Sequence, residues 1–307
     1  MVKRVLPIFG LLGAFGWVYI YAKSPSFPTP DKLLILAIFV GLVFGQAWEL
    51  TKRLVPFIGL MAVYDLFRGF ADYLNGNVNY LFMPAVDRLM FAGALPTQEL
   101  QKLLWNGQVQ WYDFFMYLMY MMHYVFVIVL AIVIWKIREQ HYWRYVTTFV
   151  AMSFAGFLTF LLFPAAPPWM SSDMGLIEPV QRVSSNVWFA LGVQDFPSMY
   201  NQISPNAVAA VPSLHAAYAT LVCLFIFQLF KGRWRYITLI YPACIYFGTV
   251  YFAEHYVFDE IVGALLGIAA FKLSYPMWRV VRRRVRQVQA LQLRRRLAYV
   301  FVNVDDE

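Results

Sequence analysis

The chain has 307 residues, of which 61% are hydrophobic and only 14% are charged. Soluble domains are nearer half apolar and a quarter charged, so this composition excludes an ordinary soluble protein and predicts an all-α, polytopic transmembrane bundle. Much of the net charge of +8 lies in the segment 279–296, directly after an apolar run. A basic segment there is typical of a cytoplasmic anchor on anionic lipid, so we expect the bilayer, and no nucleic acid, as a partner.

Eight apolar runs follow one another, each close to the roughly 20 residues that cross a bilayer. They are 5–22, 33–50, 54–74, 112–135, 142–163, 213–231, 235–253 and 256–279. The third run holds Asp65 and Arg68, which are costly in a span. However, the basic residues at 52–53, 136–144 and 231–235 all fall on the cytoplasmic side only if that run crosses. We therefore predict about six to eight spans with both termini cytoplasmic.

Three segments fall on the outer side in this arrangement, namely 23–32, about 75–111 and 164–212. The stretch Pro84–Trp105 within the second segment has apolar residues at helical spacing. This pattern predicts an amphipathic helix lying on the outer membrane surface.

Polar residues from distant parts of the chain meet on this outer face. His215 opens the sixth run and His255 opens the eighth, both at their outer ends, and Asp65 and Arg68 lie toward the outer end of the third. Ionisable groups inside a membrane are rare and are candidates for function. Their convergence on one face predicts a functional site there.

His255 is followed after one helical turn by Asp259. A carboxylate at that spacing lies on the same helix face and can hold one imidazole nitrogen, which frees the other to act as a nucleophile or base. The alternative is an interfacial histidine that is hydrogen-bonded and inert.

Pro212-Ser213-Leu214-His215 has the pattern of a helix start, because proline suits the first turn and serine suits a cap. The N-terminus of such a helix offers backbone N–H groups and a positive dipole end to an anion such as phosphate. His215 lies near this end and could protonate an oxygen leaving group. An ordinary helix start is the alternative interpretation.

The order P-S-x-H and then H-x-x-x-D resembles two signatures of the type 2 phosphatidic acid phosphatase superfamily, over about 160–270. The resemblance implies membrane phosphoryl transfer by a phosphatase-like core of six helices. It makes His255 the nucleophile that forms a phosphohistidine, Asp259 its orienting group and His215 the general acid. Ser213 would hold phosphate oxygens.

The chain departs from the common pattern of that superfamily. Gly248-Thr249 stands where Ser-Arg is usual, and Phe163–Trp169 stands where the first motif is expected. This proline-rich form of the first motif, together with Tyr251, is similar to the inositolphosphotransferase branch, which includes inositol phosphorylceramide synthases. The segment Tyr64–Arg68 also resembles an element of that branch, which makes Tyr64 a further candidate at the phosphate site.

A phosphoester needs positive charge nearby as its transition state develops, and the usual motif arginine is missing. Arg68 is the first candidate to replace it, because it is embedded in an apolar run. The alternative is an intramembrane pair of Arg68 with Asp65 or Asp72. Arg182 is the second candidate, and its alternative is an exposed loop cation.

Glu254 precedes His255 and could accept a proton from water or an alcohol, or could be a solvated loop acid. The chain has no nucleotide-binding loop, cysteine-rich site or carboxylate cluster, so we expect no metal and no cofactor. Cys223 and Cys244 lie in apolar runs, where we expect unpaired thiols.

The sequence thus predicts an integral membrane enzyme that acts on a lipid phosphate or phospholipid head group through a phosphohistidine. With water as acceptor it is a lipid phosphatase, and with an alcohol such as the polyol inositol it is a head-group phosphotransferase; both outcomes stay open. A haem-binding protein with His215 and His255 as axial ligands, or a lipid transporter, is the non-enzymatic alternative.

We expect the plasma membrane as its location, with the site on the non-cytoplasmic face. The expected parts are N-terminal membrane helices over 1–53, a membrane catalytic domain over 54–279 and a basic cytoplasmic tail over 280–307.

Overall fold

The computed structural model describes residues 2–23, 30–192 and 206–302, apart from the side chains at 2–5, 30–31, 69–73 and 285–302. This part of the chain is helical and contains no strand, which confirms the all-α class. In chain order its α-helices and 3₁₀-helices are α1 Val2–Lys23, α2 Pro30–Val43, α3 Ala47–Leu74, α4 Phe82–Met90, α5 Pro96–Leu104, α6 Trp111–Met121, α7 His123–Arg138, η1 Glu139–His141, α8 Tyr142–Leu162, α9 Pro168–Asp173, α10 Val183–Ala190, α12 Leu214–Leu229, η2 Arg233–Leu239, α13 Ile240–Tyr251 and α14 Val257–Val302.

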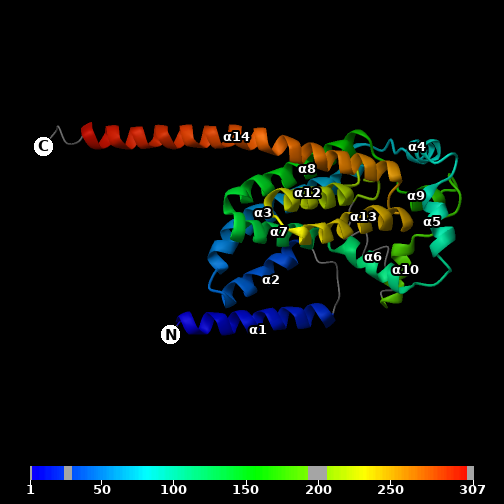
Figure 1. Ribbon diagram of the computed structural model, residues 1–307, viewed down its shortest axis with the longest axis horizontal. Coiled ribbons are helices and arrows are strands. Elements are labelled where there is room, and N and C mark those ends of the chain that lie inside the picture. Colours follow the sequence, from blue (N-terminus) through cyan, green and yellow to red (C-terminus); the bar gives the residue numbers. More distant parts are fainter. Residues whose placement is uncertain (1, 24–29, 193–205, 303–307) are drawn as a thin grey trace.

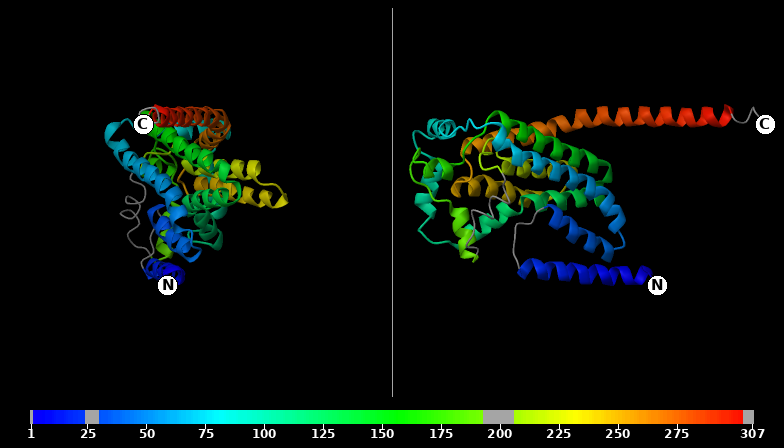
Figure 2. Two further views of the ribbon diagram at one scale, coloured as in Figure 1. Left: turned by 90° about the vertical axis from the view of Figure 1, so that its left-hand side faces the viewer. Right: turned by 180° about the vertical axis from the view of Figure 1, so that it is seen from behind.

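The long helices run side by side, and both ends of the chain lie at the same end of the bundle (Figure 1). The short helices α4, α5, α9 and α10 gather at the opposite end (Figures 1 and 2). Helix α14 has 46 residues, or about 70 Å at 1.5 Å per residue, and extends well beyond the bundle. It continues without a break from the last apolar run into the basic segment after residue 279.

Several expected spans have different bounds in the structure. The run 33–50 is divided, because α2 ends at Val43 and Gly45 adopts a positive φ of 67° before α3 begins. The run 112–135 is likewise divided at Met122 between α6 and α7. By length and composition, two helical stretches among the described residues could cross a membrane, Leu6–Lys23 and His123–Leu162.

The amphipathic segment 84–105 forms two helices, α4 and α5, where the sequence predicted one. Ala92 and Gly93 between them have φ values of 53° and 92°, which end the first helix and turn the chain. Leu89 and Leu103 are more than 80% exposed. Apolar side chains so exposed at this end of the bundle fit contact with lipid.

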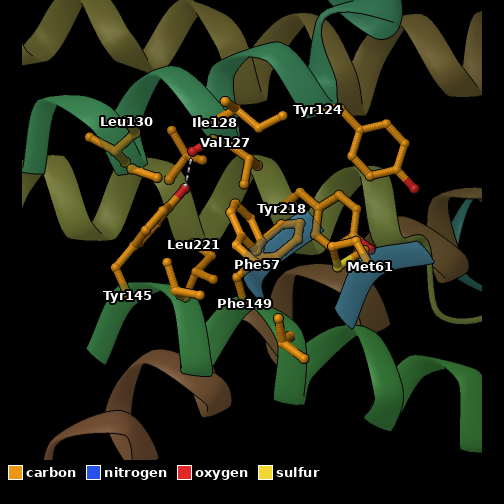
Figure 3. Packing of buried hydrophobic residues seen from close by; sticks show 14 of the residues in the cluster. Phe57, Met61, Tyr124, Val127, Ile128, Leu130, Tyr145, Phe149, Tyr218 and Leu221 are labelled. Carbon is orange, nitrogen blue, oxygen red and sulfur yellow. Dashed lines mark hydrogen bonds between the residues drawn. The ribbon is translucent and has the colours of Figure 1, made fainter. Parts of the chain in front are cut away.

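Tightly packed apolar and aromatic residues fill the centre of the bundle (Figure 3). Phe57 of α3 meets Phe149 of α8 edge to face, with ring centroids 5.6 Å apart, and Phe149 also packs on Tyr218 of α12. Tyr145 donates its hydroxyl to the carbonyl of Val127 in the same region. This core fixes α3, α7, α8 and α12 relative to one another.

Helices α12 and α14 approach each other closely through two glycines one turn apart. A Cβ atom on Gly263 would lie 2.1 Å from the carbonyl oxygen of Ser213, and one on Gly267 would lie 2.8 Å from that of Ala217. Small residues at i and i+4 allow this approach between membrane helices. The contact brings the N-terminal turns of both helices together, where His215 and His255 lie. Cys223 and Cys244 are unpaired, as expected.

Candidate active site

His255 lies in the tight turn between α13 and α14. Ala253 takes a positive φ of 63°, and the N–H groups of Glu254 and His255 both donate to the carbonyl of Thr249. A non-glycine residue rarely adopts this φ, so the turn is specified by the surrounding packing. The His255 side chain is 7% exposed and faces the N-terminus of α12.

Asp259 holds His255 from the first turn of α14. Its Oδ2 atom lies 3.5 Å from Nδ1 of His255, which is an ion-pair contact rather than a short hydrogen bond. The same oxygen accepts the backbone N–H of Tyr256 at 2.9 Å, as in a helix capping box. Asp259 therefore both caps the start of helix α14 and orients the imidazole of His255. Nε2 of that imidazole lies on the side away from Asp259.

Asp87 of α4 caps the same helix from outside. Its two carboxylate oxygens accept the backbone N–H groups of Val257 and Phe258 at 3.0 and 2.9 Å. The residue is fully buried, and burial raises the pKa of Asp87 to about 6 against the lowering effect of these two N–H groups. The surface helix α4 thus fixes the turn that carries His255.

His215 stands opposite His255. Its Nδ1 atom lies 3.3 Å from Nε2 of His255, and its ring packs on Tyr120 and His123 at centroid distances of 4.5 and 4.7 Å. Two axial haem ligands must lie on opposite faces of a porphyrin, and this direct contact leaves no room for one between them. The geometry therefore disfavours the haem-binding alternative.

Ser213 has a structural task at the start of α12. Its hydroxyl oxygen accepts the N–H of Ala216 at 3.3 Å, as the predicted cap, and its own N–H donates to the carbonyl of Asp259 at 3.1 Å. The side chain is fully buried. Ser213 thus joins the two helices that carry the histidines.

A small pocket opens beside the two histidines. Its polar lining includes Arg68, Tyr120, Asn206, His215, Glu254 and His255. This brings together three of the four predicted polar groups of the outer face. The fourth, Asp65, lies 3.9 Å from Arg68, at the limit of an ion pair. The side chain of Asp72 lies outside the described residues.

The two candidate cations occupy different places. Arg68 of α3 lines the pocket, and the fully buried Tyr64 packs behind it with its ring 5.9 Å from the guanidinium. Arg182 instead binds Glu254 with two nitrogens, at 2.9 and 3.1 Å. Its side chain is 15% exposed, so it is not an exposed loop cation.

The position of the usual motif arginine carries no charge here. Thr249 is buried, and its hydroxyl lies 2.8 Å from Oε1 of Glu260, a second buried acid on α14. Burial opposes protonation of His255, but its interaction with Asp259 and the charges of Glu260 and Glu254 outweigh that effect. Together they raise the pKa of His255 above its ordinary value.

Sequence reasoning missed three residues of this site. Asp87, Tyr120 and Glu260 received no role in a site. An acid within an amphipathic surface helix is a weak signal for Asp87, because nothing local shows which helix it caps. Glu260 directly follows Asp259, and a second acid at the start of a membrane helix could have drawn notice.

The PAP2 superfamily model matches residues 95–273, which is more than half of the chain. This chain belongs to the PAP2 superfamily. The match confirms the family indicated by the two histidine motifs, and with it a membrane enzyme that transfers phosphoryl groups on lipids.

The curated relatives that this chain resembles are synthases of the inositolphosphotransferase branch. It is 28% identical over 260 residues to a phosphoinositol dihydroceramide synthase of Bacteroides thetaiotaomicron, covering 79% of this chain and 84% of that protein. An inositol phosphorylceramide synthase of Candida albicans is 29% identical over a segment that covers half of this chain and a third of that synthase. A catalytic subunit of that synthase from Saccharomyces cerevisiae is 23% identical, over 84% of this chain and 64% of its own length. No solved structure matches.

Proposed function

We propose that this membrane enzyme transfers a phosphoinositol group from a phospholipid to the hydroxyl of a ceramide-type lipid, with the group held on His255 between the two steps. The observation that carries this proposal is the arrangement at His255. Asp259 lies on Nδ1, while Nε2 faces His215 and the pocket. The names of the curated relatives supply the substrate class.

In the first step, Nε2 of His255 attacks phosphorus and the bond from phosphorus to the glycerol oxygen breaks. His215 donates a proton to that oxygen, so diacylglycerol leaves as a neutral alcohol. In the second step, the acceptor hydroxyl gives its proton to His215 and attacks phosphorus, and the phosphorus–nitrogen bond breaks. His215, whose Nδ1 lies 3.3 Å from Nε2 of His255 in the free protein, can serve both oxygens, because they occupy the same side of the phosphorus in turn.

The donor in this scheme is a phosphodiester. A histidine that attacks a monoester carries a bare phosphoryl group, which an alcohol converts only into another monoester. Inositol phosphorylceramide joins phosphorus to two alcohols, so its phosphorus must arrive with one of them attached. We propose that inositol is that alcohol and arrives with the donor, rather than entering as the acceptor that sequence reasoning named. Water in place of the ceramide-type alcohol would give hydrolysis.

Arg68 is our proposed partner for the phosphate. It is the arginine in the pocket lining, and a cation there compensates the charge that builds on phosphate oxygens. Tyr64 packs against it and limits its movement. The N-terminal turn of α12, capped by Ser213, supplies the positive end of a helix dipole to the same anion.

For the placement in the membrane we propose six to eight spans and a site on the non-cytoplasmic face of the plasma membrane. Catalysis would reside in 54–279, with membrane helices over 1–53 and a basic tail over 280–307. Support comes from the basic residues of α7, η2 and the start of the tail, which lie toward the end of the bundle that holds both termini. The site lies at the other end.

The test uses the full-length protein in liposomes that contain ceramide and phosphatidylinositol labelled in the inositol ring. The proposal predicts label in a new ceramide-containing lipid, release of diacylglycerol, and no label there when free labelled inositol is supplied instead. Release of labelled inositol phosphate alone would identify a hydrolase. Label entering from free inositol would show that inositol is the acceptor. No product from any phospholipid would favour the transporter alternative.

A further inference from the structure

Glu254 lies inside the pocket and directly beside the proposed nucleophile. It is 6% exposed and shares the lining with His215, His255 and Arg68. This burial excludes a solvated loop acid. A buried carboxylate is costly unless it is paired and hydrogen-bonded, so the residues around Glu254 decide what it can do.

Arg182 and Ser184 hold the Glu254 carboxylate in place. The guanidinium of Arg182 donates from Nε to Oε1 and from an Nη atom to Oε2, and the hydroxyl of Ser184 donates to Oε1. Trp169 fixes Arg182 in turn, because the guanidinium lies 4.1 Å above the centroid of the indole. These contacts make the acid and the arginine a rigid pair without net charge.

This pair divides the pocket by charge. Arg68 in the lining attracts a phosphodiester anion, whereas the Glu254–Arg182 pair has no net charge to attract it, so Glu254 faces another part of the substrate. A carboxylate has about four lone-pair positions, and the contacts with Arg182 and Ser184 use three of them. The remaining acceptor capacity suits a hydroxyl. An ammonium head group would gain little, since Arg182 already compensates the negative charge.

We propose that Glu254, held by Arg182 and Ser184, is the subsite that selects a neutral polyol head group and discriminates against head groups that carry an amine. This inference rests on the proposed transfer of a phosphorylated head group, and it adds how that head group is recognised. Arg182 acts through Glu254 and is a positioning residue. Its charge sets the specificity by cancelling the charge of the acid.

The test compares two donors, phosphatidylinositol and phosphatidylethanolamine, with full-length protein in liposomes that contain ceramide. The measured quantity is the ratio of kcat/KM for the two donors, because a general loss of activity cancels in it. The wild-type protein should prefer the inositol lipid. In Glu254→Gln, loss of a charged acceptor for the hydroxyls should reduce transfer from the inositol lipid by about 10- to 100-fold, with a smaller loss for the ethanolamine lipid.

Arg182→Gln should instead favour the donor whose head group carries an amine. It leaves the Glu254 charge uncompensated, so the preference for the inositol lipid should fall by at least about tenfold and transfer of phosphoethanolamine should rise. The double variant Arg182→Gln/Glu254→Gln removes the charged pair as a whole. It covers the case in which the single arginine variant fails to fold, and it should lose the donor preference without gaining transfer of phosphoethanolamine.

Arg88 and Glu178 provide a matched control, because they form another arginine–acid pair in the outer segments, away from the pocket lining. Arg88→Gln and Glu178→Gln should keep the donor ratio within about twofold of wild type, as exposed ion pairs contribute little. A donor ratio that stays unchanged in Glu254→Gln and in the double variant overturns the inference. Failure of the wild-type protein to transfer from either donor would overturn the proposed function itself.

Discussion

The first turn of α12 and its middle pack against opposite kinds of residue. Leu221 and Phe225 in the middle join the aromatic core that Figure 3 shows. Ser213 and His215 at the start lie against Asp259 and His255. Burial of apolar side chains stabilises the fold, whereas burial of polar groups costs free energy. The apolar core therefore holds the helices together, while the polar end is retained for chemistry.

Among the described residues, some buried polar atoms at this polar end have no hydrogen-bond partner in the protein, and the same is true of others elsewhere in the bundle. Within the described part of the chain, the hydroxyl of Tyr256, Oδ1 of Asp259 and Oε2 of Glu260 are buried and have no hydrogen-bond partner in the protein. All three lie next to His255 in sequence or one turn away. The three atoms beside His255 are available to a ligand or a reacting group. Variants can therefore separate the two regions, from the largest effect on transfer to the smallest.

His255→Ala should have the largest effect. Loss of the nucleophile should reduce transfer by at least about a hundredfold, because positioning alone cannot replace the covalent step. The thermal midpoint should fall as well, since Asp259 stays buried without its histidine partner. Transfer rates and thermal melts of the purified protein measure both. His141→Ala, a histidine in η1 at the opposite end, is the control and should retain activity. Full activity of His255→Ala would support a transporter.

Gly263→Ala should damage both regions. Its Cβ would lie 2.1 Å from the carbonyl oxygen of Ser213, so α14 must move away from α12. We expect a loss of about 1–3 kcal/mol in stability from overpacking and a loss of transfer of about tenfold or more from displaced histidines. The control is Gly59→Ala in α3, where the added Cβ meets nothing within 4 Å. Equal behaviour of the two variants would show that the helix contact does not position the site.

Acid pH should lower activity while it favours folding. The raised pKa of His255 means that the neutral, nucleophilic imidazole is lost as pH falls through a value above 6.5. A raised histidine pKa contributes stability that is present below the unfolded value and is lost as pH rises through the folded value. In Glu254→Gln, one of the charges that raise this pKa is removed, so the acid limb should move to lower pH. Profiles of kcat/KM and of thermal midpoint against pH measure the two trends, and an unmoved acid limb would contradict this assignment.

Phe149→Ala should have the smallest effect on the rate per folded molecule. The cavity in the core should cost about 3–5 kcal/mol of stability, while the polar end keeps its geometry. Melting experiments and active-site-normalised rates check the two quantities. Leu158→Ala on the exposed face of the same helix is the matched control and should change neither. A large loss in the normalised rate of Phe149→Ala would mean that core and site are not separable.

The chemistry-bearing residues of the site were predictable because their signals are local. The spacing of His255 and Asp259 is one helical turn, and Ser213 caps α12 as its type predicts. Charge balance between the loops was enough to place His215, His255 and Arg68 together, and all three line one pocket.

The supporting residues could not be predicted because their partners are distant in sequence. Asp87 caps a helix that begins 170 residues later, and Arg182 binds an acid 72 residues away. The helix breaks at Gly45 and Met122 were missed for a different reason. Hydrophobicity continues through both positions, so an apolar run does not reveal where the backbone turns.

In the proposed reaction, His255 carries the phosphoinositol group between the two steps. The direct measurement is mass spectrometry of the full-length enzyme, mixed with phosphatidylinositol in the absence of ceramide and quenched at alkaline pH, where phosphohistidines survive. The account predicts a phosphoinositol adduct on His255 that disappears when ceramide is added and is absent in His255→Ala. An adduct on His215, or rapid transfer with no adduct on His255, would contradict it.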